Sequence, residues 1–178
     1  NKEFNEVSWF YPSTEATGGD PEPDSYVTYN YEEGSWSIGS LERTAWFDSF
    51  GFRQVPFSFS ETGLLYNQET GTDDDGSAMT AYVESSPMEV SAGDSLMLVD
   101  KIIPDATVSG NLFCTLYSKK YPNGSTTTKG PFTITSDTTK VSMRSRSRQM
   151  SLRMESTETG ASWLLGEFRV NAREDGLR

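Results

Sequence analysis

The sequence contains no histidine and a single cysteine, Cys114. Without histidine, the chain alone cannot build the usual zinc sites, a Ser-His-Asp triad or a Cys-His catalytic pair. One thiol cannot form a disulfide within the chain, so stability must come from packing or from assembly with other molecules. We therefore expect no cofactor, no metal ion and no catalytic residue in this chain.

Long apolar runs are also missing. No segment approaches the roughly 20 apolar residues of a membrane-spanning helix, and there is no signal-peptide pattern. Hydrophobic residues make up 34% of the 178 residues, yet aromatic residues reach 12%. This composition is typical of a folded protein with small, aromatic-rich cores and no membrane partner. Because the sequence opens on Asn1 just before a strand-like run, we also expect it to be part of a longer chain.

Basic residues are few, with 15 Lys and Arg against 26 Asp and Glu and a formal net charge of −11. The imbalance lies in residues 1–140, whose net charge is −13, whereas residues 141–178 carry seven arginines and five acidic residues, a net charge of +2. A chain this acidic repels nucleic-acid phosphates, so we expect no specific binding of DNA. The arginine-rich end is expected to pair with acidic surface on this chain or on a neighbouring copy.

The stretch Thr138–Glu155 (TTKVSMRSRSRQMSLRME) is the most informative part of the sequence. As an extended strand, it places Arg144, Arg146 and Arg148 on one side and alternating Val, Met and Ser side chains on the other. From residue 150 onward the apolar residues fall on the side that carried the arginines. A single strand cannot change its buried face in this way, so the chain must bulge or turn a corner near Ser147–Gln149.

The three arginines allow three interpretations. They form either a solvated strand face that pairs with nearby carboxylates, or a protein interface in which guanidinium groups about 7 Å apart bind carboxylates of a partner. Phosphate binding is favoured least, because no aromatic residues alternate with the arginines. The interface candidates are therefore Arg144, Arg146 and Arg148, together with an acidic turn that would supply carboxylates, Asp73, Asp74 and Asp75.

The acidic turn also resembles the start of a calcium-binding loop. Counted from Asp73, the residues Asp75, Ser77 and Glu84 stand at the third, fifth and twelfth positions, where such a loop has ligands. The sixth position, however, is Ala78 and not the glycine that allows the sharp turn. An exposed acidic turn is the favoured interpretation, and a loosely held cation is the alternative.

Short aromatic runs in residues 1–60 predict one antiparallel unit of adjacent strands, with the size of a single propeller blade. Tyr29 and Tyr31 are expected to face Trp36 and Ile38 across a tight hairpin turn. The strands expected in this blade-like unit are Glu6–Tyr11, Tyr26–Tyr31, Trp36–Ser40 and Thr44–Phe47.

Residues 61–178 predict a β-sandwich-like domain, so the whole chain is expected to be all-β. Its alternating runs are separated by connectors rich in Gly, Pro, Asn and Asp, and no helical pattern interrupts them. Just before the boundary, Pro56 argues against a central strand in the aromatic residues around it. The longer strands expected here are Ser95–Ile103, Asn111–Lys120, Phe132–Thr135 and Ala161–Asn171.

The aromatic residues of the first unit leave two functional alternatives open. Trp9, Phe10, Tyr11, Trp36 and Trp46 can stack on sugar rings, as in a carbohydrate-binding module that recognises host surface glycan, but they can equally pack the blade. A polysaccharide-degrading enzyme would need two carboxylates at a fixed separation. No motif selects two such residues among the 26 acidic ones, and core packing is favoured over sugar binding.

Several motifs together resemble the tail hub or nozzle proteins of short-tailed bacteriophages, which are also called packaged-DNA stabilisation proteins. The most specific are a W-S-I-G-x-x-x-R-T-A-W run at Trp36–Trp46, an R-x-R-x-R-Q run at Arg144–Gln149 and a D-G-x-R ending at Asp175–Arg178. Other matching stretches are FNEVSWFYPS near the start, the ETGTDDDG turn and YPNG at Tyr121–Gly124. The matches are spread over nearly the whole chain.

The resemblance implies a virion structural protein that is not an enzyme. In this family a β-propeller body lies upstream, so residues 1 to about 50 would close the propeller and the remainder would form an attached β domain. The family implies a homo-oligomeric ring, commonly of six copies, below the portal and adaptor proteins of the phage tail. Genomic DNA passes through the ring, and an acidic channel suits this role because like charges let DNA slide without binding.

Overall fold

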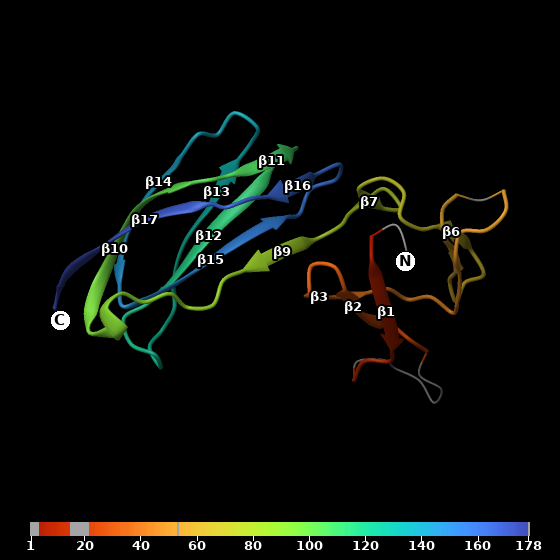
Figure 1. Cartoon of the computed structure of the whole chain (residues 1–178), viewed down its shortest axis with the longest axis horizontal. Coiled ribbons are helices and arrows are strands. Elements are labelled where there is room, and N and C mark those ends of the chain that lie inside the picture. The colour runs from red at the N-terminus through yellow and green to blue at the C-terminus, as the bar shows by residue number, and fades with distance from the viewer. Residues whose placement is uncertain (1–3, 15–21, 53, 178) are drawn as a thin grey trace. The chain divides into compact units, whose positions relative to one another are not determined.

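The computed structural model describes residues 4–14, 22–52 and 54–177. Strands dominate these residues, and the only helical segment among them is the short 3₁₀ helix η1 (Ser91–Gly93), so the predicted all-β class is confirmed. The chain divides into two compact units, residues 1–70 and 71–178 (Figure 1). In the described ranges no helix is long and apolar enough to span a membrane.

The first unit begins with a three-stranded antiparallel sheet in the order β1-β2-β3. Its strands are β1 (Glu6–Tyr11), β2 (Ser25–Asn30) and β3 (Ser35–Ser40). The register places Tyr29 opposite Trp36, as predicted, but Val27 and not Tyr31 lies opposite Ile38. The prediction for Tyr31 is wrong because this residue belongs to the turn between β2 and β3.

A second three-stranded sheet of the first unit has the order β4-β5-β6. Its strands are β4 (Ala45–Phe47), β5 (Phe57–Phe59) and β6 (Leu65–Asn67). The expectation that Thr44–Phe47 joins the preceding strands is wrong, because β4 pairs with β5. The expectation that Pro56 argues against a central strand here is wrong, because Pro56 stands just before the central strand β5, and its carbonyl oxygen accepts a hydrogen bond from the Gln68 N–H at 2.8 Å. Pairing with β4 keeps β5 and β6 in the first unit.

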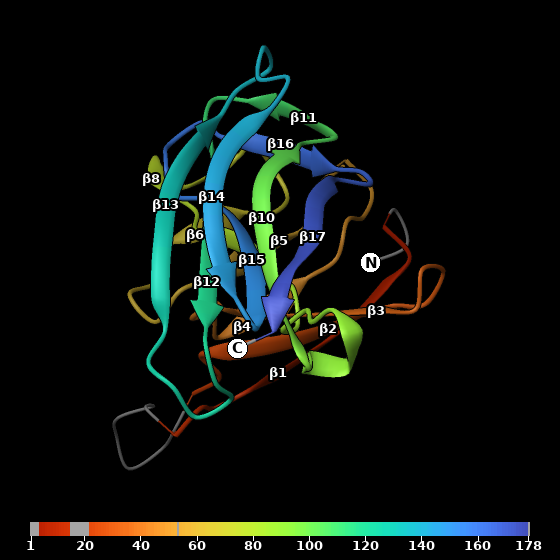
Figure 2. The ribbon, with the colours of Figure 1, turned by 90° about the vertical axis from the view of Figure 1, so that its left-hand side faces the viewer.

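The second unit is an antiparallel β-sandwich with two main layers (Figures 1 and 2). One layer is a four-stranded sheet in the order β13-β12-β15-β9, and the other is a three-stranded sheet in the order β14-β10-β17. Two smaller ladders pair β11 with β16 and β7 with β8. The bounds are β7 (Asp73–Asp74), β8 (Ser77–Ala78), β9 (Ala81–Glu84), β10 (Ser95–Ile103), β11 (Ala106–Ser109), β12 (Leu112–Lys119), β13 (Thr127–Ile134), β14 (Val141–Ser147), β15 (Gln149–Ser156), β16 (Ser162–Leu165) and β17 (Arg169–Leu177).

The core of the second unit lies between its two layers. Leu116 and Met154 of the four-stranded layer are almost inaccessible to solvent, and so are Val99 and Ile102 of the facing layer. Full burial of each such side chain stabilises the fold by about 1.5–3 kcal/mol. Cys114 belongs to the same cluster, and its burial raises the pKa of the thiol to about 12. The thiol is therefore a structural group without thiolate reactivity.

The corner predicted near Ser147–Gln149 is confirmed at Arg148. Strand β14 belongs to the three-stranded layer and β15 to the four-stranded layer, and Arg148 is the single residue between them. In β14 the odd-numbered residues are buried, whereas in β15 the even-numbered residues are buried. The chain thus passes from one layer of the sandwich to the other, and the change of buried parity in the sequence marks this corner.

Candidate functional site

One face of the β1-β2-β3 sheet is apolar and exposed to solvent. Trp36 is 64% exposed and Ile38 is 76% exposed. The ring centroid of Trp36 lies 4.5 Å from that of Tyr29 and 6.1 Å from that of Trp9, so the rings form a continuous row. The cross-strand register places on this face Val7, Trp9, Tyr11, Val27, Tyr29, Trp36 and Ile38, with Ser25 and Ser40 at its end. The seven apolar and aromatic residues are called the aromatic face below.

The opposite face of the same sheet is only partly covered within the first unit, because Ser8, Ser35 and Ser37 on it are exposed. Thr28 is buried, and its hydroxyl lies 2.7 Å from the Ser8 Oγ. The ring of Phe10 packs against Trp46 of β4 and Tyr26 of β2, at centroid distances of 5.7 and 5.8 Å. The five aromatics considered for sugar stacking are thus divided between two faces. Among the described apolar residues of this sheet, Trp36 and Ile38 of the aromatic face are the most exposed.

The structure places Arg144 and Arg146 on the outer face of β14, and Arg148 at the corner that follows. The Arg146 Nε lies 2.6 Å from the Asp175 Oδ2, and its Nη2 donates to the Asp175 carbonyl oxygen at 2.6 Å. Gly176 has a φ of +86°, and a Cβ at this position would lie 3.4 Å from the Arg146 Nη2. Arg146 therefore holds the end of β17 within its own unit.

The other two arginines have no such partner. Within the described ranges, no carboxylate forms an ion pair with Arg144 or Arg148. Arg146 and Arg148 line a cavity of about 400 Å³, whose other charged residues are Lys120 and Asp94. Arg144 does not line this cavity, so the structure brings two of the three candidate arginines together.

The acidic turn forms a tight hairpin between β7 and β8. Asp75 and Gly76 occupy the turn with φ values of 47° and 80°, as a two-residue hairpin loop requires. The carboxylate of Asp73 accepts a hydrogen bond from the backbone N–H of Gly160, whereas the side chain of Asp74 is exposed. Within the described ranges no ion pair joins this turn to the arginines, and no cluster of three or more metal-ligating side chains occurs there.

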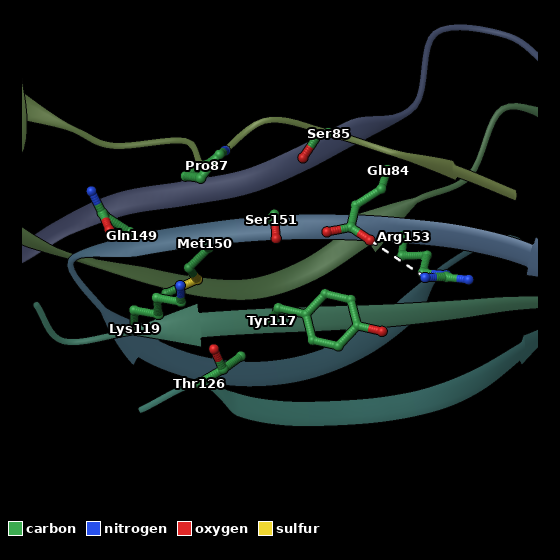
Figure 3. Close-up of a pocket in the computed structure, with 10 residues that line it drawn as sticks. All are labelled: Glu84, Ser85, Pro87, Tyr117, Lys119, Thr126, Gln149, Met150, Ser151 and Arg153. Atoms are coloured by element: carbon green, nitrogen blue, oxygen red, sulfur yellow. Dashed lines mark ion pairs between the residues drawn. The ribbon is translucent and has the colours of Figure 1, made fainter. Parts of the chain in front are cut away.

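A pocket of about 430 Å³ lies on the outer face of the four-stranded layer, where β9 ends (Figure 3). Outward-pointing residues of β15 and β12 contribute to it, because alternate residues of both strands face away from the core. This pocket is called the sheet pocket below, and the residues that matter for its chemistry are Glu84, Tyr117, Lys119, Gln149, Ser151 and Arg153.

Arg153 is the most highly connected side chain of the sheet pocket. Its Nη1 lies 3.6 Å from the Glu84 Oε2, and its Nε donates to the Glu155 Oε2 at 3.0 Å. The guanidinium carbon lies 3.9 Å from the centre of the Tyr82 ring. Stacking on Tyr82 and pairing with two carboxylates fix the orientation of the guanidinium. A planar guanidinium favours both kinds of contact.

The sheet pocket was not predicted from the sequence. Its acidic residue, Glu84, was expected only as the last ligand of a calcium loop, and Tyr117 only as part of the strand Asn111–Lys120. The available signal was the polar side of Gln149–Glu155, where Gln, Ser, Arg and Glu alternate with buried residues. This signal identifies an outward face, but pairing with β9 and β12 is needed to form a pocket.

Neither a family model nor a curated protein matches this sequence.

Proposed function

We propose that this chain is a non-enzymatic structural module of a virion, the C-terminal part of a tail hub or nozzle of a short-tailed bacteriophage. The observation that carries the proposal is the aromatic face, an apolar surface that no described part of its own unit covers. A contiguous exposed apolar surface is typical of a protein–protein interface. The assignment to a phage tail rests on the resemblance of the sequence motifs.

The partner that fits the aromatic face best is another β-sheet. The face consists of alternate residues of paired strands, and sheets pack on one another through such positions at about 10 Å. None of its residues is charged, so a charged partner surface would lose hydration without gaining a counter-ion. We therefore propose that the β1-β2-β3 sheet packs against a neighbouring blade and closes a propeller-like body in a ring-shaped assembly.

In this assembly the chain would hold or gate the DNA exit channel, with the portal, adaptor and other tail proteins as partners. The net charge of −11 supports passage of DNA without specific binding. Arg144 and Arg148 are better interface candidates than Arg146, because Arg146 already binds Asp175. Acidic surface on a neighbouring copy, including the turn Asp73–Asp75, would supply their carboxylates.

Glycan binding by the aromatic face is less well supported. Small-molecule sites combine apolar walls with placed polar groups that fix the orientation of the ligand. The aromatic face has no charged or amide side chain. No observation favours a polysaccharide-degrading enzyme.

Light scattering and electron microscopy of the full-length protein test the proposed assembly. We expect closed rings with a central hole, and we expect the double substitution Trp36→Lys and Ile38→Lys to prevent their formation because it buries two unpaired charges. Leu164→Lys is the control, because Leu164 is 74% exposed but belongs to the second unit. Rings that tolerate the double substitution would exclude the aromatic face as the interface. Monomers under every condition, with portal complexes present, would exclude the ring.

A further inference from the structure

We propose that the sheet pocket binds a neutral carbohydrate, a function separate from assembly through the aromatic face. Its volume of about 430 Å³ lies within the range of roughly 300–1,000 Å³ that is typical of small-molecule sites. Two neighbouring strands of a four-stranded sheet, β12 and β15, carry most of the residues that matter. A site on paired strands is held in place before the ligand arrives, which lowers the entropic cost of binding.

Tyr117 supplies an aromatic surface in the pocket. It points outward from β12, and its cross-strand neighbour is the small residue Ser151. Within the ranges that the structure describes, no ring or guanidinium stacks on Tyr117, and Figure 3 shows its ring among the lining side chains. The C–H face of a sugar packs well on such a ring, because stacking buries apolar area and leaves the hydroxyls at the edge free.

Arg153 supplies fixed hydrogen-bond donors. Its contacts with Glu84 and Glu155 use Nη1 and Nε. A guanidinium has five N–H groups, so Nη2 retains donors for a ligand oxygen. The guanidinium is planar, and stacking on Tyr82 fixes the orientation of this plane. The dashed ion pair in Figure 3 shows Glu84 holding Arg153 at the edge of the pocket.

Gln149 and Lys119 complete the set of polar groups. The Gln149 Nε2 donates to Glu89, which fixes the amide and leaves its carbonyl oxygen as an acceptor. Lys119 lies opposite Gln149 in the register and adds a flexible donor. The pocket therefore offers donors and acceptors around one aromatic ring. A ring that carries several hydroxyl groups matches this set, because each hydroxyl both donates and accepts.

The charge balance favours a neutral ligand. The positive charges of Lys119 and Arg153 are offset by the carboxylates of Glu84 and Glu155, both of which contact Arg153. An anion would find no excess of positive charge here, and the net charge of −11 would repel it. Phosphates and acidic sugars are therefore less suitable ligands than uncharged sugars.

The backbone of β15 beneath the pocket is not available to a peptide as an added strand. Such binding needs an edge strand with free N–H and C=O groups. Here the Leu152 carbonyl accepts from the Ser85 N–H at 2.9 Å, and Met150 exchanges both backbone hydrogen bonds with Met88. Strand β15 is thus paired on both sides along the pocket, and only side chains remain to bind a ligand.

The lining is suited to binding and not to hydrolysis. Of the ten lining residues drawn in Figure 3, only Glu84 carries a carboxyl group. Hydrolysis of a glycosidic bond requires a second carboxyl group on the other side of the bond. The proposal is therefore recognition of a glycan without cleavage.

Nuclear magnetic resonance of the ¹⁵N-labelled chain tests the proposal. The probes are methyl α-D-glucopyranoside, methyl β-D-galactopyranoside and N-acetyl-D-glucosamine at millimolar concentrations. We expect at least one probe to give saturable shifts at Tyr117 and Ser151. Tyr117→Ala should raise its Kd by at least about tenfold, whereas Tyr117→Phe should keep the Kd within about threefold. The matched control is Tyr121→Ala, which removes an exposed tyrosine outside the sheet pocket and should leave the Kd of the probe unchanged.

Each contrary result would overturn the proposal. No shift at the pocket with any of the three probes would exclude a neutral sugar site. Shifts confined to Trp9 and Trp36 would move sugar binding to the aromatic face, and equal shifts with inorganic phosphate would show an anion site. Should Tyr117→Ala fail to fold, Ser151→Trp fills the pocket floor and must abolish binding. Unaltered binding by Ser151→Trp would refute the location.

Discussion

The substitution Ile38→Thr separates packing within the chain from packing in the proposed assembly. Ile38 is 76% exposed, so its side chain adds little to the stability of the isolated chain. Threonine keeps the β-branched shape that favours a strand. We expect the free energy of unfolding of the isolated chain to change by less than about 0.5 kcal/mol.

In the assembled protein the same substitution should lower the stability by a larger amount. Full burial of an isoleucine side chain contributes about 1.5–3 kcal/mol. Because 76% of Ile38 is still exposed, a covering sheet gains about 1–2 kcal/mol from it. A loss of this size weakens one interface by about 5- to 30-fold. The effect should recur at every copy of the interface in a ring.

Urea denaturation of the isolated chain and of the assembled full-length protein gives the comparison, provided that the m value stays constant. Leu164→Thr is the control, because Leu164 has a similar exposure of 74% but lies in β16. We expect this control to leave the free energy of unfolding of both proteins unchanged. An equal loss in the two proteins, or no loss in the assembled one, would refute the assignment of Ile38 to a buried interface.

Three further predictions concern the second unit. Arg146→Gln should lower the free energy of unfolding by only about 0.2–1 kcal/mol, because the ion pair with Asp175 is about half exposed. Thermal unfolding at high salt should show a smaller difference between the variant and the unsubstituted chain, because salt screens the ion pair. Arg144→Gln with Arg148→Gln should leave unfolding unchanged but reduce ring formation measured by light scattering, and unaltered rings would remove the interface assignment. Burial raises the pKa of the Cys114 thiol from 9.0 to about 12. Above pH 9 the thiol therefore loses its proton in the unfolded state but keeps it in the folded state. The free energy of unfolding should then fall by about 1.4 kcal/mol per pH unit up to about pH 12. Cys114→Ala should abolish this part of the pH dependence in urea titrations, and a slope that survives it would assign the effect to other groups.

Local patterns in the sequence predicted the strands and the sandwich corner well. The parity change around Arg148 located the passage from β14 to β15 because a strand packed on one face must alternate with period two. The span Ser95–Ile103 matches β10 residue for residue, since it is an apolar run bounded by turn residues. The run Ala161–Asn171, by contrast, is divided between β16 and β17, and the segment Ala106–Ser109, expected as a connector, is strand β11.

Pairing between distant strands could not be predicted from local patterns. Thr44–Phe47 follows β3 directly and has the same aromatic character, yet it pairs with Phe57–Phe59. Strand propensity reports that a segment fits a pleated surface, and it does not identify the neighbour. The sheet pocket was missed for the same reason, because Glu84 meets Arg153 only through the pairing of β9 with β15. Its residues carry no motif until the register brings them together.

The two units bury their apolar residues in different ways, and this difference separates the two proposed roles. The second unit buries a cluster of apolar side chains between its two layers, so its core forms without a partner. The first unit leaves Trp36 and Ile38 exposed, so it gains stability only when another surface covers them. Because the aromatic face and the sheet pocket belong to different units and share no residue, we expect the effects of substitutions in the two sites to be additive. A coupling between Ile38→Thr and Tyr117→Ala would show that assembly and sugar binding use one connected surface.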